Sequence, residues 1–381
     1  MSRLLPSLLN RRGFIKSGGA GMVLQTAASA QNAAVRPWVN LQGDGVGMPP
    51  AEYVQLLSKL TAATAKADVY LKGGAVEELE SRFAARLGKE RALFFPTGTL
   101  ANHVAVRLLA GERRHVLVQE ESHLYRDEGD CAQLLSGLNL VPLGPGRATI
   151  PFTEISEAVA RAASPPYPVP VGAISIESPV RRTREQAFDF EEMKKIANFA
   201  REKKIGLHLD GARMYLASAY TGISPATYAA QFDTVYVSLY KYFNAPFGAV
   251  LAGPAGLMES AAVLRHQFGG GLLHAWQSAA VALHFADGFE ERYARAVRAG
   301  DEVLGRMEKG GVKLVRVPAG TNVVGIQVPQ ERAASLQQNL AGASIAIGKP
   351  PAEGPLWIQV NETILRRPAE EIAGALVKAL V

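Results

Sequence analysis

Cysteine is almost absent from this sequence. Cys131 is the only one among 381 residues, so the chain cannot form an internal disulfide in any compartment. The seven histidines are scattered, and no set of Cys and His has the spacing of a zinc site. His123, for example, follows Glu120 and Glu121 without a second histidine nearby. We therefore expect no structural metal.

A strong charge excess and long apolar runs are also missing from most of the chain. The net charge is +6, from 41 basic and 35 acidic residues. Residues 1–30 contain no acid and four of the bases, which are Arg3, Arg11, Arg12 and Lys16. The rest carries a balance of only +2 without a basic stripe, which is not typical of nucleic-acid binding. After residue 30 no stretch predicts a transmembrane helix.

The basic start predicts an export signal. The segment Asn10–Lys16 contains two adjacent arginines followed by a hydrophobic pair, and it resembles a twin-arginine signal. A short apolar stretch follows at Ser17–Ala27, and Ala28-Ser29-Ala30 supplies the small residues that a signal peptidase needs. We expect a signal peptide at residues 1–30, folding in the cytoplasm, export to the periplasm, and membrane contact only through this signal. An amphipathic or disordered tail is the alternative, and an uncleaved signal would act as an anchor.

The remainder alternates short apolar runs with amphipathic stretches, which predicts an α/β sheet. Runs flanked by Gly or Pro indicate buried strands at 92–95, 115–119, 171–177, 205–210, 234–239 and 249–252. Helical spacing predicts helices at 52–63, 76–87, 100–109, 190–203 and 254–265, with a long one from 277 towards 307. A smaller αβ unit follows, with strands at 312–317, 321–328 and 356–360 and helices at 333–340 and 368–380. We place an N-terminal arm and large domain at 31–280 and a small domain at 281–381.

The turn Thr97-Gly98-Thr99 joins a predicted strand to a predicted helix. The free N–H groups of a helix N-terminus, together with threonine hydroxyls, can cradle a phosphate group. A simple N-cap is the alternative interpretation of the same turn.

Two further residues stand at predicted strand ends. Asp210 precedes Gly211, and its carboxylate can face a cationic heterocycle in the crevice of the sheet. At ~4 Å the attraction to a protonated pyridine nitrogen is on the order of 4 kcal/mol, or roughly three pK units. Lys241 follows the strand at 234–239, and an amine in a desolvated pocket is biased toward its nucleophilic form. An Asp-Gly turn and a solvated strand end are the alternatives.

The order and spacing of these motifs resemble those of the threonine aldolase/β-eliminating lyase family. The resemblance covers nearly the whole chain after about Val39 and is strongest between Asp68 and Ala282. Its motifs are Asp68-Val69-Tyr70, Glu77-Glu78-Leu79-Glu80, Thr97-Gly98-Thr99, Ser122-His123, Asp210-Gly211-Ala212-Arg213, Lys241 with Ala245-Pro246-Phe247-Gly248, Gly269-Gly270-Gly271, and Thr321-Asn322.

The resemblance implies the aspartate aminotransferase fold (type I of the pyridoxal-phosphate-dependent enzymes), with a large doubly wound domain and a small C-terminal αβ domain. It also implies pyridoxal 5'-phosphate as cofactor. Lys241 would hold it as a Schiff base, Asp210 would pair with the pyridine nitrogen, and His123 would stack on the ring. Gly98 and Thr99 would bind the phosphate. For His123, a partly buried histidine at a helix start is the alternative.

The resemblance further implies a small amino-acid substrate and a homodimer or homotetramer. Arg213 would hold the substrate carboxylate as a bidentate fork, unless it is a structural ion-pair partner. Glu128 matches an acidic position of the family and is a further active-site candidate.

The departures from the family lie around the substrate. Gln42-Gly43-Asp44-Gly45 stands where members have Arg-Ser-Asp-Thr, so a substrate-contacting hydroxyl is missing. Tyr240 and Tyr242 flank Lys241 in place of small residues, and Leu272-Leu273-His274 replaces Met-Arg-Gln. The stretch 356–361 lacks a second carboxylate-binding arginine. We expect retained cofactor binding with altered substrate recognition.

The function that follows is a pyridoxal-phosphate-dependent lyase, which cleaves a β-hydroxy amino acid to glycine and an aldehyde. A β-eliminating lyase, or another reaction on a different amine, is one alternative. An exported, non-catalytic binding protein that keeps the fold is the other.

Overall fold

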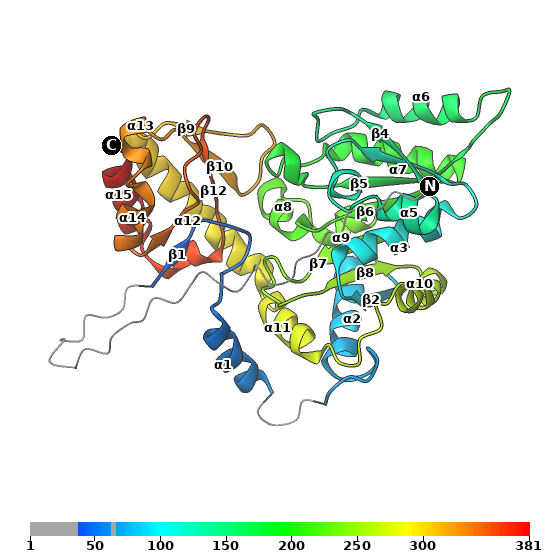
Figure 1. Cartoon of the computed structure of the whole chain (residues 1–381), viewed down its shortest axis with the longest axis horizontal. Helices are drawn as coiled ribbons and strands as arrows, with labels where there is room; N and C mark the ends of the chain where they lie inside the picture. Colours follow the sequence, from blue (N-terminus) through cyan, green and yellow to red (C-terminus); the bar gives the residue numbers. More distant parts are fainter. Residues whose placement is uncertain (1–36, 62–65) are drawn as a thin grey trace, which may run out of the picture. The chain divides into compact units, whose positions relative to one another are not determined.

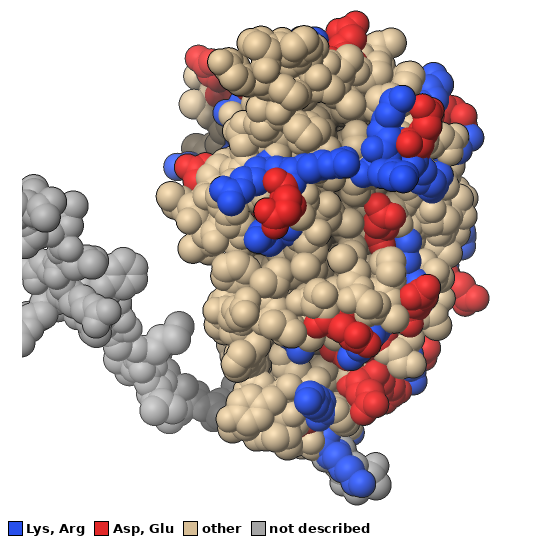
Figure 2. Space-filling model, turned by 90° about the vertical axis from the view of Figure 1, so that its right-hand side faces the viewer, with Lys and Arg blue, Asp and Glu red and all other residues tan. Residues whose placement is uncertain are grey.

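The computed structural model describes residues 37–61 and 66–381, and Pro37–Val381 forms one compact unit. The export signal predicted for residues 1–30 lies outside the described residues. Within the described part of the chain, no helix is long and apolar enough to cross a membrane. Figure 2 shows both signs of charge on one face, with many Lys and Arg side chains in a stripe across its upper half and Asp and Glu side chains in both halves.

A seven-stranded sheet forms the centre of the larger part (Figure 1). Its order is β2-β8-β7-β6-β5-β3-β4, and only β8 runs antiparallel to its neighbours. Every residue of β5, β7 and β8 is buried, which explains their continuous apolar runs. The strands are β2 (Arg91–Phe95), β3 (His115–Gln119), β4 (Asn139–Leu143), β5 (Val171–Glu177), β6 (Gly206–Asp210), β7 (Thr234–Ser238) and β8 (Ala249–Gly253).

Helices cover both faces of this sheet. Alternate residues of β2 show the division, because Leu93 and Phe95 pack with α3 and α10 while Phe94 belongs to the larger core on the other face. This mostly parallel α/β sheet confirms the expected fold class. The helices of this part are α2 (Gly74–Leu87), α3 (Gly98–Ala110), α4 (His123–Arg126), α5 (Cys131–Ser136), α6 (Phe152–Ala162), η1 (Arg181–Thr183), α7 (Phe190–Lys203), α8 (Met214–Thr221), α9 (Pro225–Ala229), α10 (Ala255–Gln267) and α11 (Trp276–Ala286).

The C-terminal part contains a three-stranded antiparallel sheet of order β12-β10-β9. The N-terminal arm before α1 (Pro50–Leu60) also joins this part, because its strand β1 (Val39–Asn40) pairs with β11 (Ile345–Ala346). The domain boundary at residue 280 stays a prediction. The remaining elements are α12 (Phe289–Lys309), β9 (Leu314–Val315), β10 (Val323–Ile326), α13 (Gln330–Ala333), α14 (Leu336–Gly342), β12 (Leu356–Gln359), η2 (Glu362–Arg366) and α15 (Ala369–Leu380).

Two helix predictions were wrong in extent. The long helix from 277 towards 307 is divided into α11 and α12 at Gly288, whose φ of 60° is left-handed and does not continue a helix. The helix predicted at 333–340 is likewise two short helices, α13 and α14. Strand β4 had not been expected, and it lies at the sheet edge, where Pro142 is tolerated.

Candidate active site

The residues singled out from the sequence gather at one edge of the central sheet. The parallel strands β2, β3, β5, β6 and β7 all point their carboxyl ends to this edge, which is where open α/β sheets bind ligands. At or just after these ends come Gly98 and Thr99, His123, Glu177, Asp210 and Lys241.

The start of α3 leaves backbone donors free. The Thr97 hydroxyl accepts the Leu100 N–H at 3.2 Å, and the Thr97 carbonyl accepts the Ala101 N–H at 3.2 Å. The N–H groups of Gly98 and Thr99 therefore have no acceptor within the helix. Two free donors at a helix N-terminus suit a phosphate group, so this end of the site fits the predicted cradle.

Gly98 allows a close approach that no other residue would allow. A Cβ atom at this position would lie 2.1 Å from Oη and 2.5 Å from Cζ of Tyr236, a buried side chain of β7. Glycine is therefore required where α3 begins over the sheet.

We expect Gly98→Ala to lower the free energy of unfolding by about 1–3 kcal/mol, because the buried ring of Tyr236 must shift. Gly256→Ala in α10 is the matched control, since nothing lies within 4 Å of its added Cβ. That variant is expected to be neutral or more stable by up to about 1 kcal/mol. Urea unfolding of both variants measures the difference, and equal stabilities would contradict the packing described.

Asp210 is buried at the end of β6 and held by two donors. Its Oδ1 accepts the Ala212 N–H at 3.1 Å, and its Oδ2 accepts a hydrogen bond from Asn102 Nδ2 at 2.8 Å. Asn102 also donates to Glu128 Oε1 at 2.9 Å, and its Oδ1 lies 3.0 Å from Nε2 of His208. Sequence reasoning missed Asn102. Its only signal was its position one helical turn after Gly98, on the face that meets the sheet.

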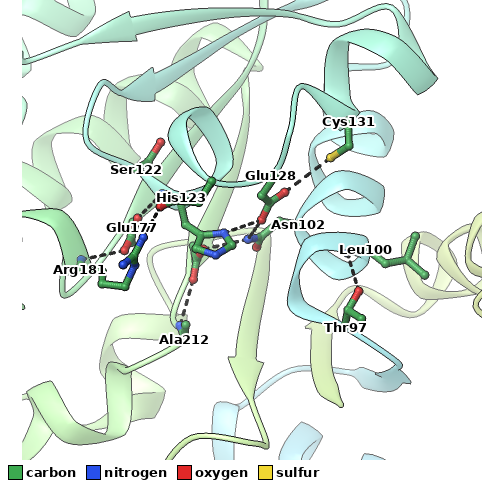
Figure 3. A network of polar contacts seen from close by, with 12 residues as sticks. Thr97, Leu100, Asn102, Ser122, His123, Glu128, Cys131, Glu177, Arg181 and Ala212 are labelled. Atoms are coloured by element: carbon green, nitrogen blue, oxygen red, sulfur yellow. Dashed lines mark hydrogen bonds and ion pairs between the residues drawn. The ribbon is translucent and has the colours of Figure 1, made fainter. Parts of the chain in front are cut away.

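His123 begins α4 and contacts two of the buried acids (Figure 3). Its Nδ1 lies 2.9 Å from Glu128 Oε1, and its backbone N–H donates to Glu177 Oε2 at 2.6 Å. Burial raises the pKa of Glu128, and the hydrogen bond to Glu128 raises the pKa of His123. Both pKa shifts favour a proton on the His123–Glu128 pair. Burial also raises the pKa of Glu177, to about 8.

The network has more acidic than basic groups. Glu128, Glu177 and Asp210 are all buried in it, and His123 is the one basic side chain that contacts them in the described residues. A cation placed here would relieve their mutual repulsion, so the chemistry of the donor set fits a protonated pyridine ring. In the described residues no cluster of three or more acidic, His or Cys side chains could hold a metal ion.

Lys241 is half-buried and lines a cavity of about 630 Å³ together with Asp44, Tyr53 and Tyr240. Its Nζ lies 4.7 Å from the ring centroid of Tyr240 and 3.4 Å from the Tyr240 hydroxyl. Tyr242, the other tyrosine that flanks Lys241 in the sequence, lies in an aromatic cluster. Its ring is buried against Phe243 and Phe289, with centroid distances of 4.6 and 5.1 Å.

Arg213 is ion-paired with two acids. Its Nε lies 2.8 Å from Asp44 Oδ2 and 3.2 Å from Glu185 Oε1. Asp44 belongs to the stretch that departs from the family, and Glu185 was missed altogether because it is distant in sequence. In residues 37–61 and 66–381, no acceptor hydrogen-bonds to the two terminal guanidinium nitrogens. The side that could grip a carboxylate therefore carries no protein partner.

Free N–H groups at a helix start, a buried acid, an imidazole and a half-buried lysine at one edge of the sheet suit pyridoxal 5'-phosphate. The beta-eliminating lyase model matches residues 44–330, and the chain belongs to this family. It is accordingly a pyridoxal-phosphate-dependent lyase.

Individual relatives agree with this assignment. The chain is 32% identical to the low-specificity L-threonine aldolase of Candida albicans over 228 residues, which are 59% of this chain and 60% of that protein. It is 28% identical over 296 residues to the low specificity L-threonine aldolase of Saccharomyces cerevisiae, covering 77% and 75% of the two chains. A crystal structure from Listeria monocytogenes, assigned as an L-allo-threonine aldolase, matches with a TM-score of 0.77 and 26% identity over 91% of this chain and 96% of that one.

Proposed function

We propose that the protein cleaves the Cα–Cβ bond of a β-hydroxy amino acid and releases glycine and an aldehyde. The observation that carries the proposal is the His123–Glu128 pair, whose 2.9 Å contact places a proton-holding group beside Asp210. The names of the relatives support the same reaction. Lys241 would bind the cofactor, and Gly98 and Thr99 would hold its phosphate.

The cofactor, when bound, supplies a protonated ring that takes up the electron pair of the breaking bond. Asp210 keeps that ring protonated, because its buried carboxylate is aligned by Asn102. Arg213 orients the substrate through its carboxylate. His123 takes the proton of the β-hydroxyl as the carbonyl of the aldehyde forms, and Lys241 returns a proton to Cα. One hydroxyl proton leaves and one proton reaches Cα, so the reaction needs no oxidant.

Product analysis tests this reaction. The holoenzyme is incubated with a series of β-hydroxy amino acids, and the products are followed by NMR. Equal amounts of glycine and aldehyde are expected. Release of no aldehyde from any member of the series would refute the proposal.

We expect His123→Phe to lower kcat by about 10²-fold or more, while the cofactor stays bound. Phenylalanine keeps an aromatic face for stacking but cannot move a proton. Glu128→Gln is the matched variant, since it keeps the shape but removes the negative partner that raises the pKa of His123. If neutral His123 is the base, the acidic limb of the kcat–pH profile moves to lower pH in this variant. An unchanged limb would contradict the assignment.

A β-elimination is the second candidate. It is suggested by Gly43, which offers no hydroxyl to the substrate. A β-elimination would yield a keto acid and ammonia. The same NMR experiment distinguishes it from aldol cleavage by its products.

We also propose a homodimer or homotetramer. Tyr70 and Leu273 are 61% and 52% exposed and are linked by a 2.9 Å hydrogen bond from the Tyr70 N–H to the Leu273 carbonyl. Helix α1 contains no fully buried residue, and its Val54 is 64% exposed. Light scattering of the purified protein tests this, and a monomeric mass would refute it.

Export to the periplasm remains a proposal that rests on the sequence of residues 1–30. Replacing Arg11 and Arg12 with lysines should leave the protein in the cytoplasmic fraction. Unchanged export of that variant would refute the twin-arginine route.

A further inference from the structure

Glu185, the second ion-pair partner of Arg213, lies in a segment with an unusual backbone. Arg184 and Glu185 have φ values of 60° and 57°, in the left-handed region that favours glycine. Two contacts hold this conformation, since the Glu185 N–H donates to the Val180 carbonyl at 3.0 Å and the Thr321 hydroxyl donates to the Glu185 carbonyl at 2.9 Å. Consecutive strained residues persist where the surroundings fix them, often at functional sites. This strain places the Glu185 side chain.

That side chain is buried and shares a single guanidinium with Asp44. The Nε–H of Arg213 donates to Asp44 Oδ2 at 2.8 Å, and Glu185 Oε1 lies 3.2 Å from the same nitrogen. One further oxygen of each acid, Asp44 Oδ1 and Glu185 Oε2, is buried without a hydrogen-bond partner in the described part of the chain. Two carboxylates therefore compete for one arginine.

The competition affects how Arg213 can receive a third carboxylate. With both acids charged, Asp44, Glu185 and Arg213 together carry one excess negative charge. An incoming carboxylate is then repelled, although the terminal guanidinium nitrogens have no acceptor among the described residues. With Glu185 protonated, the arginine and Asp44 balance each other. A substrate carboxylate then meets a guanidinium with no opposing excess charge.

The groups around Glu185 come from five places in the fold. Arg213 precedes α8, Asp44 lies in the arm, Lys241 follows β7, and Arg181 and Glu177 lie at η1 and the end of β5. Burial raises the pKa of Glu185 to about 7, although Arg213 opposes the shift. Its charge therefore changes close to neutrality.

We propose that Glu185 is a positioning residue that sets the affinity of Arg213 for the substrate carboxylate, high when Glu185 is neutral and low when it is charged. The proposal rests on the carboxylate-binding role of Arg213 in the proposed function. Because Glu185 becomes neutral on acidification, carboxylates should bind more tightly as pH falls through its pKa.

Binding of propionate to the holoenzyme tests this without turnover. Propionate has no amine, and it stays charged between about pH 5.5 and pH 8.5; propionamide is the uncharged control. By calorimetry, the wild type should bind propionate at least about tenfold more tightly at the lower pH. The Glu185→Gln variant should bind propionate with the same affinity at both pH values. That affinity should equal the affinity of the wild type at the lower pH. Glu157→Gln, at an exposed position of α6, should behave as wild type.

Three outcomes overturn the proposal. They are a wild type whose propionate affinity does not change with pH, a Glu185→Gln protein that keeps the pH dependence, and a wild type that binds no propionate at the lower pH. The wild-type titration decides even if Glu185→Gln does not fold. Product analysis is independent, so failure of aldol cleavage and failure of this inference are separate results.

Discussion

Lys241→Ala is expected to abolish turnover, with a fall in kcat on the order of 10³-fold or more, while the protein stays folded. In the proposed function the lysine amine holds the cofactor in place and moves a proton, and a free amine from solution cannot replace a group fixed beside the reacting atoms. Lys241 is half-buried at a loop, and within the described residues its side chain makes one hydrogen bond, to Tyr240. Its removal should therefore cost little stability. Stopped-flow turnover and the visible spectrum of bound cofactor measure the effect.

Lys203→Ala is the control for this variant. Lys203 lies on the surface of α7, where it pairs with the exposed Glu202. Its loss should leave both turnover and the cofactor spectrum unchanged. A Lys241→Ala protein with the wild-type spectrum and activity would show that another residue holds the cofactor.

Asp210→Asn is expected to lower kcat by about 10²–10³-fold. The asparagine keeps the shape but loses the charge that, in the proposed function, holds the ring protonated, an effect of roughly three pK units at ~4 Å. In the native protein Asn102 Nδ2 donates a hydrogen bond to Asp210 Oδ2. The new amide has one acceptor oxygen fewer, so its N–H group can face another donor. The pH titration of the bound cofactor's spectrum reports ring protonation directly.

Asp233→Asn is the matched control at the opposite end of the same strand. Asp233 accepts the Leu207 N–H at 2.8 Å where β6 begins, away from the site. Its replacement should cost about 1 kcal/mol of stability and leave the cofactor spectrum unchanged. Equal kcat values for the two variants would contradict the role assigned to Asp210.

The central strands could be read from the sequence because they are buried on both faces. A parallel strand covered by helices forms a continuous apolar run, and the expected strands at 115–119 and 171–177 coincide with β3 and β5. Edge strand β4 lacks that signal, since exposed Asn139 opens it and Pro142 interrupts it. The division of α11 from α12 depends on the left-handed conformation of Gly288, which a helical pattern does not reveal.

The site was predictable where each residue stands at a strand end or a helix start. Asp210, His123 and the start of α3 occupy such positions, and the structure brings them to one edge of the sheet. Their partners were not predictable, because Asn102 reaches Asp210 across 108 positions and Asp44 reaches Arg213 across 169. Such pairs depend on the packing of the arm and α3 against the strands, and neither leaves a local pattern.

The attachment of the cofactor to Lys241 is the central claim, and mass spectrometry tests it most directly. Borohydride treatment of the holoenzyme fixes a lysine-bound cofactor to its lysine as a stable secondary amine, and proteolysis then releases the modified peptide. We predict that the added mass of the reduced pyridoxyl phosphate lies on the peptide that contains Lys241. Its presence on another lysine, or on none, would contradict the account.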